Sequence, residues 1–102
     1  MRLEIEFLDE ALEEAEAAAR WYAERSESAA LGFADEIGVA ASAIQRLPTA
    51  WPPFEQGTRR YLLRRYPFSV VDRVERTRIL IVAVAHGHRQ PGYWQSRLPV
   101  PH

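Results

Sequence analysis

The chain has 102 residues, a length that fits one domain with a single hydrophobic core. Hydrophobic residues make up 47% of the chain and charged residues 26%, which excludes the apolar-poor composition of a disordered protein. The chain contains no cysteine, and this excludes disulfides, thiolate nucleophiles and zinc sites with cysteine ligands. We therefore expect one folded domain over residues 1–102, with a flexible end at about residues 97–102.

The formal net charge of −1 conceals opposite charges in the two halves of the chain. Residues 1–57 hold 4 Arg and 12 Asp or Glu, a net charge of −8, whereas residues 58–102 hold 9 Arg and 2 Asp or Glu, a net charge of +7. All 13 basic residues are Arg, whose planar guanidinium suits phosphate and carboxylate groups. The basic half is thus predicted to bind a polyanion or an acidic partner; the alternative is a solvated strand face that discourages aggregation.

No part of the sequence resembles a membrane or export segment. No stretch approaches the roughly 20 apolar residues that cross a bilayer. Residues 1–9 alternate charged and apolar side chains, unlike the apolar core of a signal peptide. We predict a cytoplasmic protein without a membrane partner.

The acidic half predicts a strand followed by two helices. Apolar residues alternate with charged ones over residues 3–7, the period of a half-buried strand. Asp9 is the predicted N-cap of the first helix. The apolar positions expected to face the core are Leu8, Leu12, Ala15, Ala19 and Tyr22 in this helix and Phe33, Ile37, Ala40, Ile44 and Leu47 in the second. A polar link at residues 26–28 joins the helices, and Pro48 ends the second, so we expect an antiparallel helical hairpin.

The basic half predicts three strands, at residues 61–65, 68–74 and 78–86. A segment rich in proline and turn residues, 51–57, leads into them. The last strand is continuously apolar from residue 79 to residue 85, which is typical of a strand covered on both faces or central in its sheet. The order β-α-α-β-β-β predicts an α+β domain in which the helical hairpin packs on one face of a small, mainly antiparallel sheet.

After the last strand, the sequence predicts an ordered loop. Residues 87–102 contain Gly, three Pro and two aromatic residues. Tyr93 and Trp94 are expected to pack this loop against the domain. We find no internal repeat, low-complexity segment or domain linker.

A family resemblance is carried by three segments of the basic half, residues 59–71, 79–86 and 89–94. The first helix with Trp21 and Tyr22, and the end of the second helix at Leu47 and Pro48, match as well, so the likeness covers nearly the whole chain. In order and spacing these segments resemble the RelE/ParE toxin family of type II toxin-antitoxin systems. The resemblance implies growth inhibition, no cofactor, and a cognate antitoxin whose acidic and apolar segment wraps the helices and covers basic surface in a hetero-oligomer.

The resemblance leaves the cellular target open. Members of the RelE kind cleave messenger RNA in the ribosomal A site, members of the ParE kind inhibit DNA gyrase, and the shared fold does not choose between them. A third possibility is a non-toxic remnant that retains only antitoxin binding. ParE-like inhibition of gyrase is favoured because arginine is a poor general base. In addition, Asp72 places a carboxylate beside the possible phosphate site, unless Arg73 or Arg64 neutralises it.

The resemblance also implies candidate site residues. RNA cleavage by a 2′-hydroxyl needs a proton acceptor, a proton donor and cations for the developing phosphate charge. If the protein is a nuclease, these catalytic groups are expected at Arg65, Arg73, His86 and Tyr93. The residues expected to bind a partner or target are Arg59, Arg60, Arg64, Arg89 and Trp94.

Several candidate residues have structural alternatives. His86 and His88, with His102, are potential metal ligands, but no carboxylate cluster or fourth ligand stands at a matching spacing. We therefore predict no metal, and His86 as a strand-end residue bonded to the backbone is the alternative to a proton-transfer role. All three tryptophans are expected to pack in the core and hairpin more than to stack on bases, and the acidic surface of the first helix is expected to be merely solvated.

Overall fold

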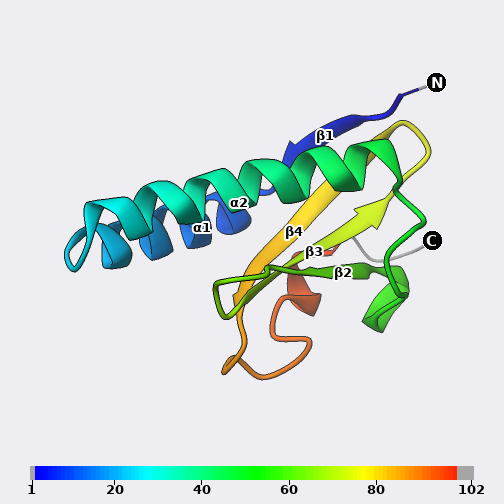
Figure 1. Cartoon of the computed structure of the whole chain (residues 1–102). Helices are drawn as coiled ribbons and strands as arrows, with labels where there is room; N and C mark the ends of the chain where they lie inside the picture. Colours follow the sequence, from blue (N-terminus) through cyan, green and yellow to red (C-terminus); the bar gives the residue numbers. More distant parts are fainter. Residues whose placement is uncertain (1, 99–102) are drawn as a thin grey trace.

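The computed structural model describes residues 2–98 and has the predicted order of elements (Figure 1). These are β1 (Glu4–Phe7), α1 (Asp9–Ala23), α2 (Glu27–Arg46), β2 (Arg59–Leu62), β3 (Phe68–Val74) and β4 (Arg78–His86), with short 3-10 helices at Glu55–Gly57 and Gln95–Arg97. The α+β class is confirmed, as are the strands at residues 68–74 and 78–86. The strand predicted at residues 61–65 begins and ends earlier. Within residues 2–98, no helix has the length and apolarity needed to cross a bilayer.

The four strands form one sheet in the order β1-β4-β3-β2. β4 pairs in parallel with β1 and antiparallel with β3, so it is central, as its continuous apolar run predicts. β1 is short and ends at Phe7, opposite Ile81. The last residues of β4, 82–86, therefore have no strand beside them on that edge.

The helical hairpin covers one face of the sheet and extends beyond it (Figure 1). The core under the helices contains Ala11, Ala18, Phe33, Ala40, Ile44, Leu63, Val70, Ile79, Ile81 and Val84. The predicted α1 positions are partly wrong, because Leu12 is 47% exposed while Ala11 and Ala18 are buried. The small alanine side chains bring α1 close to β4. In α2 the predicted positions hold up to Ile44, but Leu47 is exposed.

The start of α1 also differs from the prediction. The N-cap is Leu8, which offers no side-chain hydrogen bond, and Asp9 is the first residue of the helix. The Asp9 carboxylate is still placed favourably, because the helix dipole favours negative charge in the first turn. Ser26, in contrast, is a side-chain cap of α2, since its hydroxyl accepts a hydrogen bond from Ala29 N at 3.2 Å.

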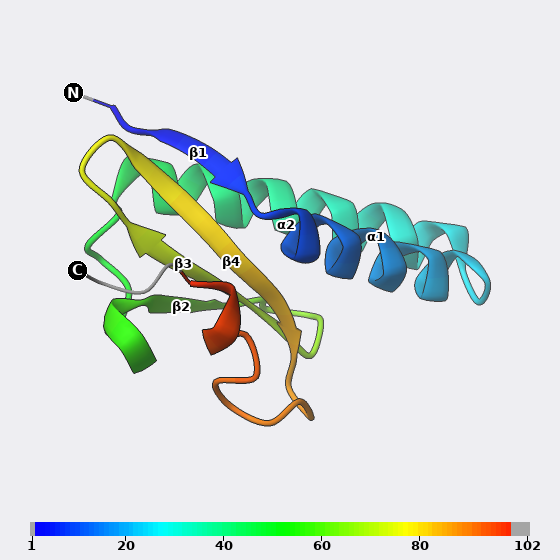
Figure 2. The ribbon, with the colours of Figure 1, turned by 180° about the vertical axis from the view of Figure 1, so that it is seen from behind.

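The C-terminal segment packs on the face of the sheet that the helices leave free (Figure 2). The core on this side contains Val71, Leu80, Val82, Ala83, Ala85 and Trp94, with Phe54, Tyr93 and Leu98 packed against it. This confirms the expectation that Tyr93 and Trp94 pack the loop. Arg97 and Leu98, which the sequence assigns to the flexible end, make specific contacts here. Residues 99–102 lie outside the described residues.

Two glycines of α2 are expected to respond oppositely to alanine. A Cβ at Gly32 would lie 2.5 Å from the Tyr66 hydroxyl oxygen, whereas a Cβ at Gly38 would meet nothing within 4 Å. Gly38→Ala should therefore raise the free energy of unfolding by about 0.5–1 kcal/mol through helix propensity. Gly32→Ala should lower it by about 1 kcal/mol or more, because it displaces Tyr66. Urea denaturation measures both changes, and a stabilising Gly32→Ala would contradict the close approach of Tyr66.

Candidate functional site

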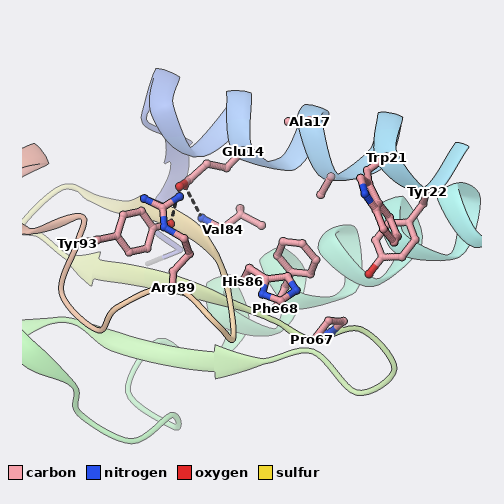
Figure 3. Close-up of a pocket in the computed structure, with 11 residues that line it drawn as sticks. Glu14, Ala17, Trp21, Tyr22, Pro67, Phe68, Val84, His86, Arg89 and Tyr93 are labelled. Atoms are coloured by element: carbon pink, nitrogen blue, oxygen red, sulfur yellow. Dashed lines mark hydrogen bonds between the residues drawn. The ribbon is translucent and has the colours of Figure 1, made fainter. Parts of the chain in front are cut away.

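A groove of about 490 Å³ lies between α1 and the end of β4 (Figure 3). It exists because β1 stops opposite Ile81, so that α1 is the element beside the last residues of β4. Ala17 and Ala18 present only methyl groups to this space. The larger side chains that line the groove are Glu14, Trp21, Tyr22, Phe68, His86, Arg89 and Tyr93.

Glu14 joins three parts of the chain at one end of the groove. Its Oε1 accepts hydrogen bonds from Val84 N at 3.1 Å and from Arg97 Nη1 at 2.8 Å. Its Oε2 accepts one from Arg97 Nη2 at 3.0 Å and one from the Tyr93 hydroxyl. The carboxylate thus links α1 to the C-terminal segment and to the part of β4 that has no neighbouring strand on this edge. The sequence predicts that the acidic surface of the first helix is merely solvated, and for Glu14 this prediction is wrong.

Tyr93 is held as a protonated phenol. Burial raises the pKa of its hydroxyl, and the hydrogen bond to Glu14 raises that pKa further, since deprotonation would place two negative charges together. Arg97 and Arg89, both stacked near the ring, oppose this shift more weakly. A phenol in this state is a poor proton acceptor at neutral pH.

His86 faces the groove at the end of β4 (Figure 3). Its ring packs edge to face on Phe68, with the centroids 5.0 Å apart. Its Nδ1 accepts a hydrogen bond from His88 N at 3.0 Å, which agrees with a strand-end residue bonded to the backbone and leaves Nε2 as the ring nitrogen for other partners. No group of three potential metal ligands occurs among residues 2–98, and His102 lies outside that range.

The four residues suggested for a nuclease do not come together. His86 and Tyr93 line the groove. Arg65 lies in the turn between β2 and β3, where its Nε is 3.4 Å from Glu36 Oε2. Arg73 forms an ion pair with Glu75 at the other end of the sheet. Arg73 pairs with Leu80, six residues before His86 on β4, a separation of about 20 Å along the strand.

The five residues suggested for binding are also dispersed. Arg89 is exposed beside the groove, with its guanidinium 3.8 Å from the Tyr93 ring centroid. Arg64 is exposed in the β2–β3 turn, and Arg60 stacks over Phe54 at 4.4 Å. Arg59 is half-buried and donates to Trp51 O at 2.7 Å.

Two predictions for tryptophans are wrong. Trp94 is predicted both as a binding residue and as a packing residue, and because its indole fills the second core and is 1% exposed, only the packing role agrees with the structure. Trp21 is predicted in the core, but it is 53% exposed, because it lies near the end of α1, in the part of the helical hairpin that extends beyond the sheet. Trp21 instead forms a wall of the groove.

Asp72 is buried in the sheet opposite Arg59. Burial raises the pKa of its carboxyl to about 6, an effect that Arg59 partly opposes. Its Oδ2 has no hydrogen-bond partner among the described residues. The cation beside Asp72 is Arg59, which the β2–β3 register places opposite it, whereas Arg73 is paired with Glu75. Asp72 is therefore a buried core carboxyl and not part of a surface phosphate site.

Little in the sequence indicates the groove. Glu14 and Arg97 are 83 residues apart, and Glu14 looks like any other acidic residue of the first helix turns. One pattern could have helped: Ala17 and Ala18 interrupt an acidic helix surface with small side chains next to Trp21. Small residues beside an exposed aromatic residue are compatible with a groove, but they are not specific for one.

Known proteins resemble this chain in both sequence and fold. Residues 5–91 match the family model described as ParE toxin of type II toxin-antitoxin system, parDE. A solved structure titled Chromosomal ParDE TA system from P. aeruginosa contains a chain that is 24% identical, with a TM-score of 0.75, over 83% of this chain and 96% of that one. A search of curated proteins found no match. The structural match shows the shared fold, and because the family model spans both helices and all four strands, the chain belongs to the ParE toxin family of type II toxin-antitoxin systems.

Proposed function

We propose that this protein inhibits bacterial growth by acting on DNA gyrase in the cytoplasm and that a cognate antitoxin neutralises it. The observation that carries the proposal is the match to the ParE toxin model over residues 5–91. Inhibition of gyrase is the activity associated with the ParE kind of toxin, in contrast to the messenger RNA cleavage of the RelE kind.

The arrangement of the candidate catalytic groups supports gyrase over RNA cleavage. An RNA-cleaving site needs a proton acceptor, a proton donor and phosphate-binding cations within reach of one another. Here Arg73 is paired with Glu75, and the Tyr93 hydroxyl donates a hydrogen bond to Glu14. His86 is then the group in the groove that remains for proton transfer. One such group does not supply both the proton acceptor and the proton donor that RNA cleavage needs.

The groove is the proposed docking place for the antitoxin. Its walls are largely apolar, and Trp21 stays half exposed at its rim, held by Arg25, whose guanidinium lies 3.7 Å from the indole centroid. Arg89 adds a cation with no ion pair to any described residue. An antitoxin segment with apolar side chains and a carboxylate matches this combination, since burial of an aromatic anchor and a charge-assisted hydrogen bond both favour binding.

The test is a supercoiling assay with purified gyrase. Gyrase inhibition predicts that the purified protein blocks supercoiling of relaxed plasmid. The product of a short gene adjacent to the toxin gene, added in equimolar amount, should restore it. Inducible expression with separate labelling of DNA and protein synthesis gives the cellular readout, and DNA synthesis should stop first. Uninhibited gyrase together with an early stop in protein synthesis would sink the proposal in favour of RNA cleavage, and unaffected growth would favour a non-toxic remnant.

A pair of variants tests the docking place in the same assay. Trp21→Glu puts a charge at the rim of the groove, so the variant should still inhibit gyrase but require at least about tenfold more antitoxin for reversal. Leu31→Glu is the control, because Leu31 is 63% exposed on α2 and does not line the groove. Equal antitoxin requirements for the two variants would exclude the groove as the docking place.

A further inference from the structure

The turn between β2 and β3, residues 63–67, is an exposed cationic turn that is anchored at several points. It carries Arg64 and Arg65, both exposed. Glu36 of α2 accepts hydrogen bonds through Oε1 from Arg64 N at 2.8 Å and from Arg65 N at 3.4 Å. The Tyr66 hydroxyl donates to Ala29 O at 2.7 Å. α2 therefore holds the backbone of a turn whose two guanidinium groups remain at the surface.

The anchoring continues on the other side of the turn. Pro67 O accepts a hydrogen bond from Gly87 N at 2.7 Å, and Phe68 pairs with His86. The start of the segment after β4 therefore lies beside the turn, and Arg89 follows Gly87 by two residues. We call Arg64, Arg65 and Arg89 the arginine tip.

The arginine tip is largely free of carboxylate partners. Among residues 2–98, neither Arg64 nor Arg89 takes part in an ion pair, and Arg65 makes a single 3.4 Å contact with Glu36 while its side chain stays 74% exposed. The opposite end of the sheet also carries arginines, but there Arg73 and Arg78 are both paired with Glu75. The tip thus combines three guanidinium groups with one carboxylate partner, Glu36, in a chain whose formal net charge is −1.

The surface of the tip favours a nucleic acid over a protein. The exposed residues of the two segments are Arg64, Arg65, Pro67, Gly87, His88, Arg89, Gln90 and Pro91, with no large apolar side chain among them. The centre of a protein interface is depleted in charge and rich in apolar side chains. Interfaces with DNA are polar and positively charged. A turn whose backbone is already ordered before binding also lowers the entropic cost of contacting phosphates.

We propose that the arginine tip contacts the phosphate backbone of duplex DNA. The inference rests on the proposed action on gyrase, whose substrate is DNA, and adds to it a second contact: the toxin touches the DNA that the enzyme holds as well as the enzyme. Arg89 belongs both to the tip and to the antitoxin groove. An antitoxin seated in the groove would therefore also cover part of the DNA contact.

The test measures binding of the toxin alone to a fluorescent duplex of about 20 base pairs, by anisotropy over a range of salt concentrations. The variant Arg64→Gln/Arg65→Gln/Arg89→Gln should bind at least about tenfold more weakly at low salt. The slope of log affinity against log salt should fall by about 3, one unit for each lost phosphate contact. The single variants Arg64→Gln and Arg89→Gln should each lower the slope by about 1, which keeps the test decisive if the triple variant does not fold.

Arg76→Gln is the matched control, because Arg76 is exposed at the opposite end of the sheet, in the turn between β3 and β4. Its DNA affinity should stay within about twofold of the parent. An equal loss in the control would show that net charge and not the tip governs binding, and unchanged affinity in the tip variants would overturn the proposal. Tighter binding to single-stranded RNA of the same length than to duplex DNA would overturn it as well. Since no gyrase is present, failure here leaves the supercoiling result to decide the proposed function separately.

Discussion

Replacing Glu14 with alanine is expected to lower the free energy of unfolding by about 2 to 4 kcal/mol, somewhat less than for a fully buried ion pair because both side chains keep some contact with solvent. The Glu14 and Arg97 side chains are only 19% and 15% exposed. The substitution removes the acceptor for the Arg97 guanidinium, for the Tyr93 hydroxyl and for Val84 N. A part-buried cation without its partner costs more than the pair itself contributes, because the guanidinium has lost much of its hydration and gains no ion pair in return.

Urea denaturation at neutral pH measures the effect. Glu13→Ala is the control, because Glu13 lies on the same helix but is exposed, and it should change the free energy of unfolding by less than about 0.5 kcal/mol. Tyr93→Phe removes one of the hydrogen bonds and should cost about 1 kcal/mol. A loss for Glu14→Ala no larger than that for Glu13→Ala would mean that Glu14 does not join α1 to the C-terminal segment.

Asp72 is expected to make the protein less stable as the pH rises. Its pKa increases from 3.8 to about 6 on folding, so the folded state binds more protons than the unfolded state between these values. The contribution of Asp72 to stability is therefore greatest below about pH 4 and is lost as the pH rises through about 6. The shift corresponds to about 3 kcal/mol, the cost of ionising a carboxyl in the core that Arg59 offsets only in part.

Asp72→Asn isolates this contribution, since an amide has nearly the same shape and does not ionise. The variant should gain stability relative to the parent as the pH increases from about 4 to about 8, by up to about 3 kcal/mol. The difference between the two proteins is the useful quantity, because the pKa of Glu75 is lowered by its hydrogen bonds to Arg78 and Arg73 and acts with the opposite sign. Asp35→Asn, at an exposed position of α2, serves as the control, and a difference that does not vary with pH would contradict the raised pKa of Asp72.

Local patterns were sufficient to predict most of the fold. Residues 68–74 and 78–86 form strands as predicted, because an apolar run bounded by turn residues is a local signal. The ends of the elements and the side chains that they bury were less predictable. β2 runs from Arg59 to Leu62 because its pairing with β3 sets its limits, and the burial of Ala11 in place of Leu12 depends on how closely α1 approaches β4.

The candidate site was predicted only in part. His86, Arg89 and Tyr93 were selected from the sequence, and the fold brings them to one groove. Arg73 was selected with them but lies about 20 Å away along the sheet, because strand register and not residue type determines which end a side chain occupies. Glu14 was overlooked, since an acidic residue in the first turns of a helix is ordinarily solvated.

The sequence by itself determined the α+β class, the order of elements and the concentration of arginine in the second half, because composition and periodicity are properties of neighbouring residues. The resemblance to RelE/ParE toxins was visible as well, in the order and spacing of the segments that carry it. Only the tertiary structure decided that Trp21 is exposed, that Glu14 binds Arg97 and that Asp72 faces Arg59. These facts depend on contacts between residues far apart in the chain. Such contacts are set by where β1 ends, how far the hairpin extends and which strands pair, and no local pattern encodes them.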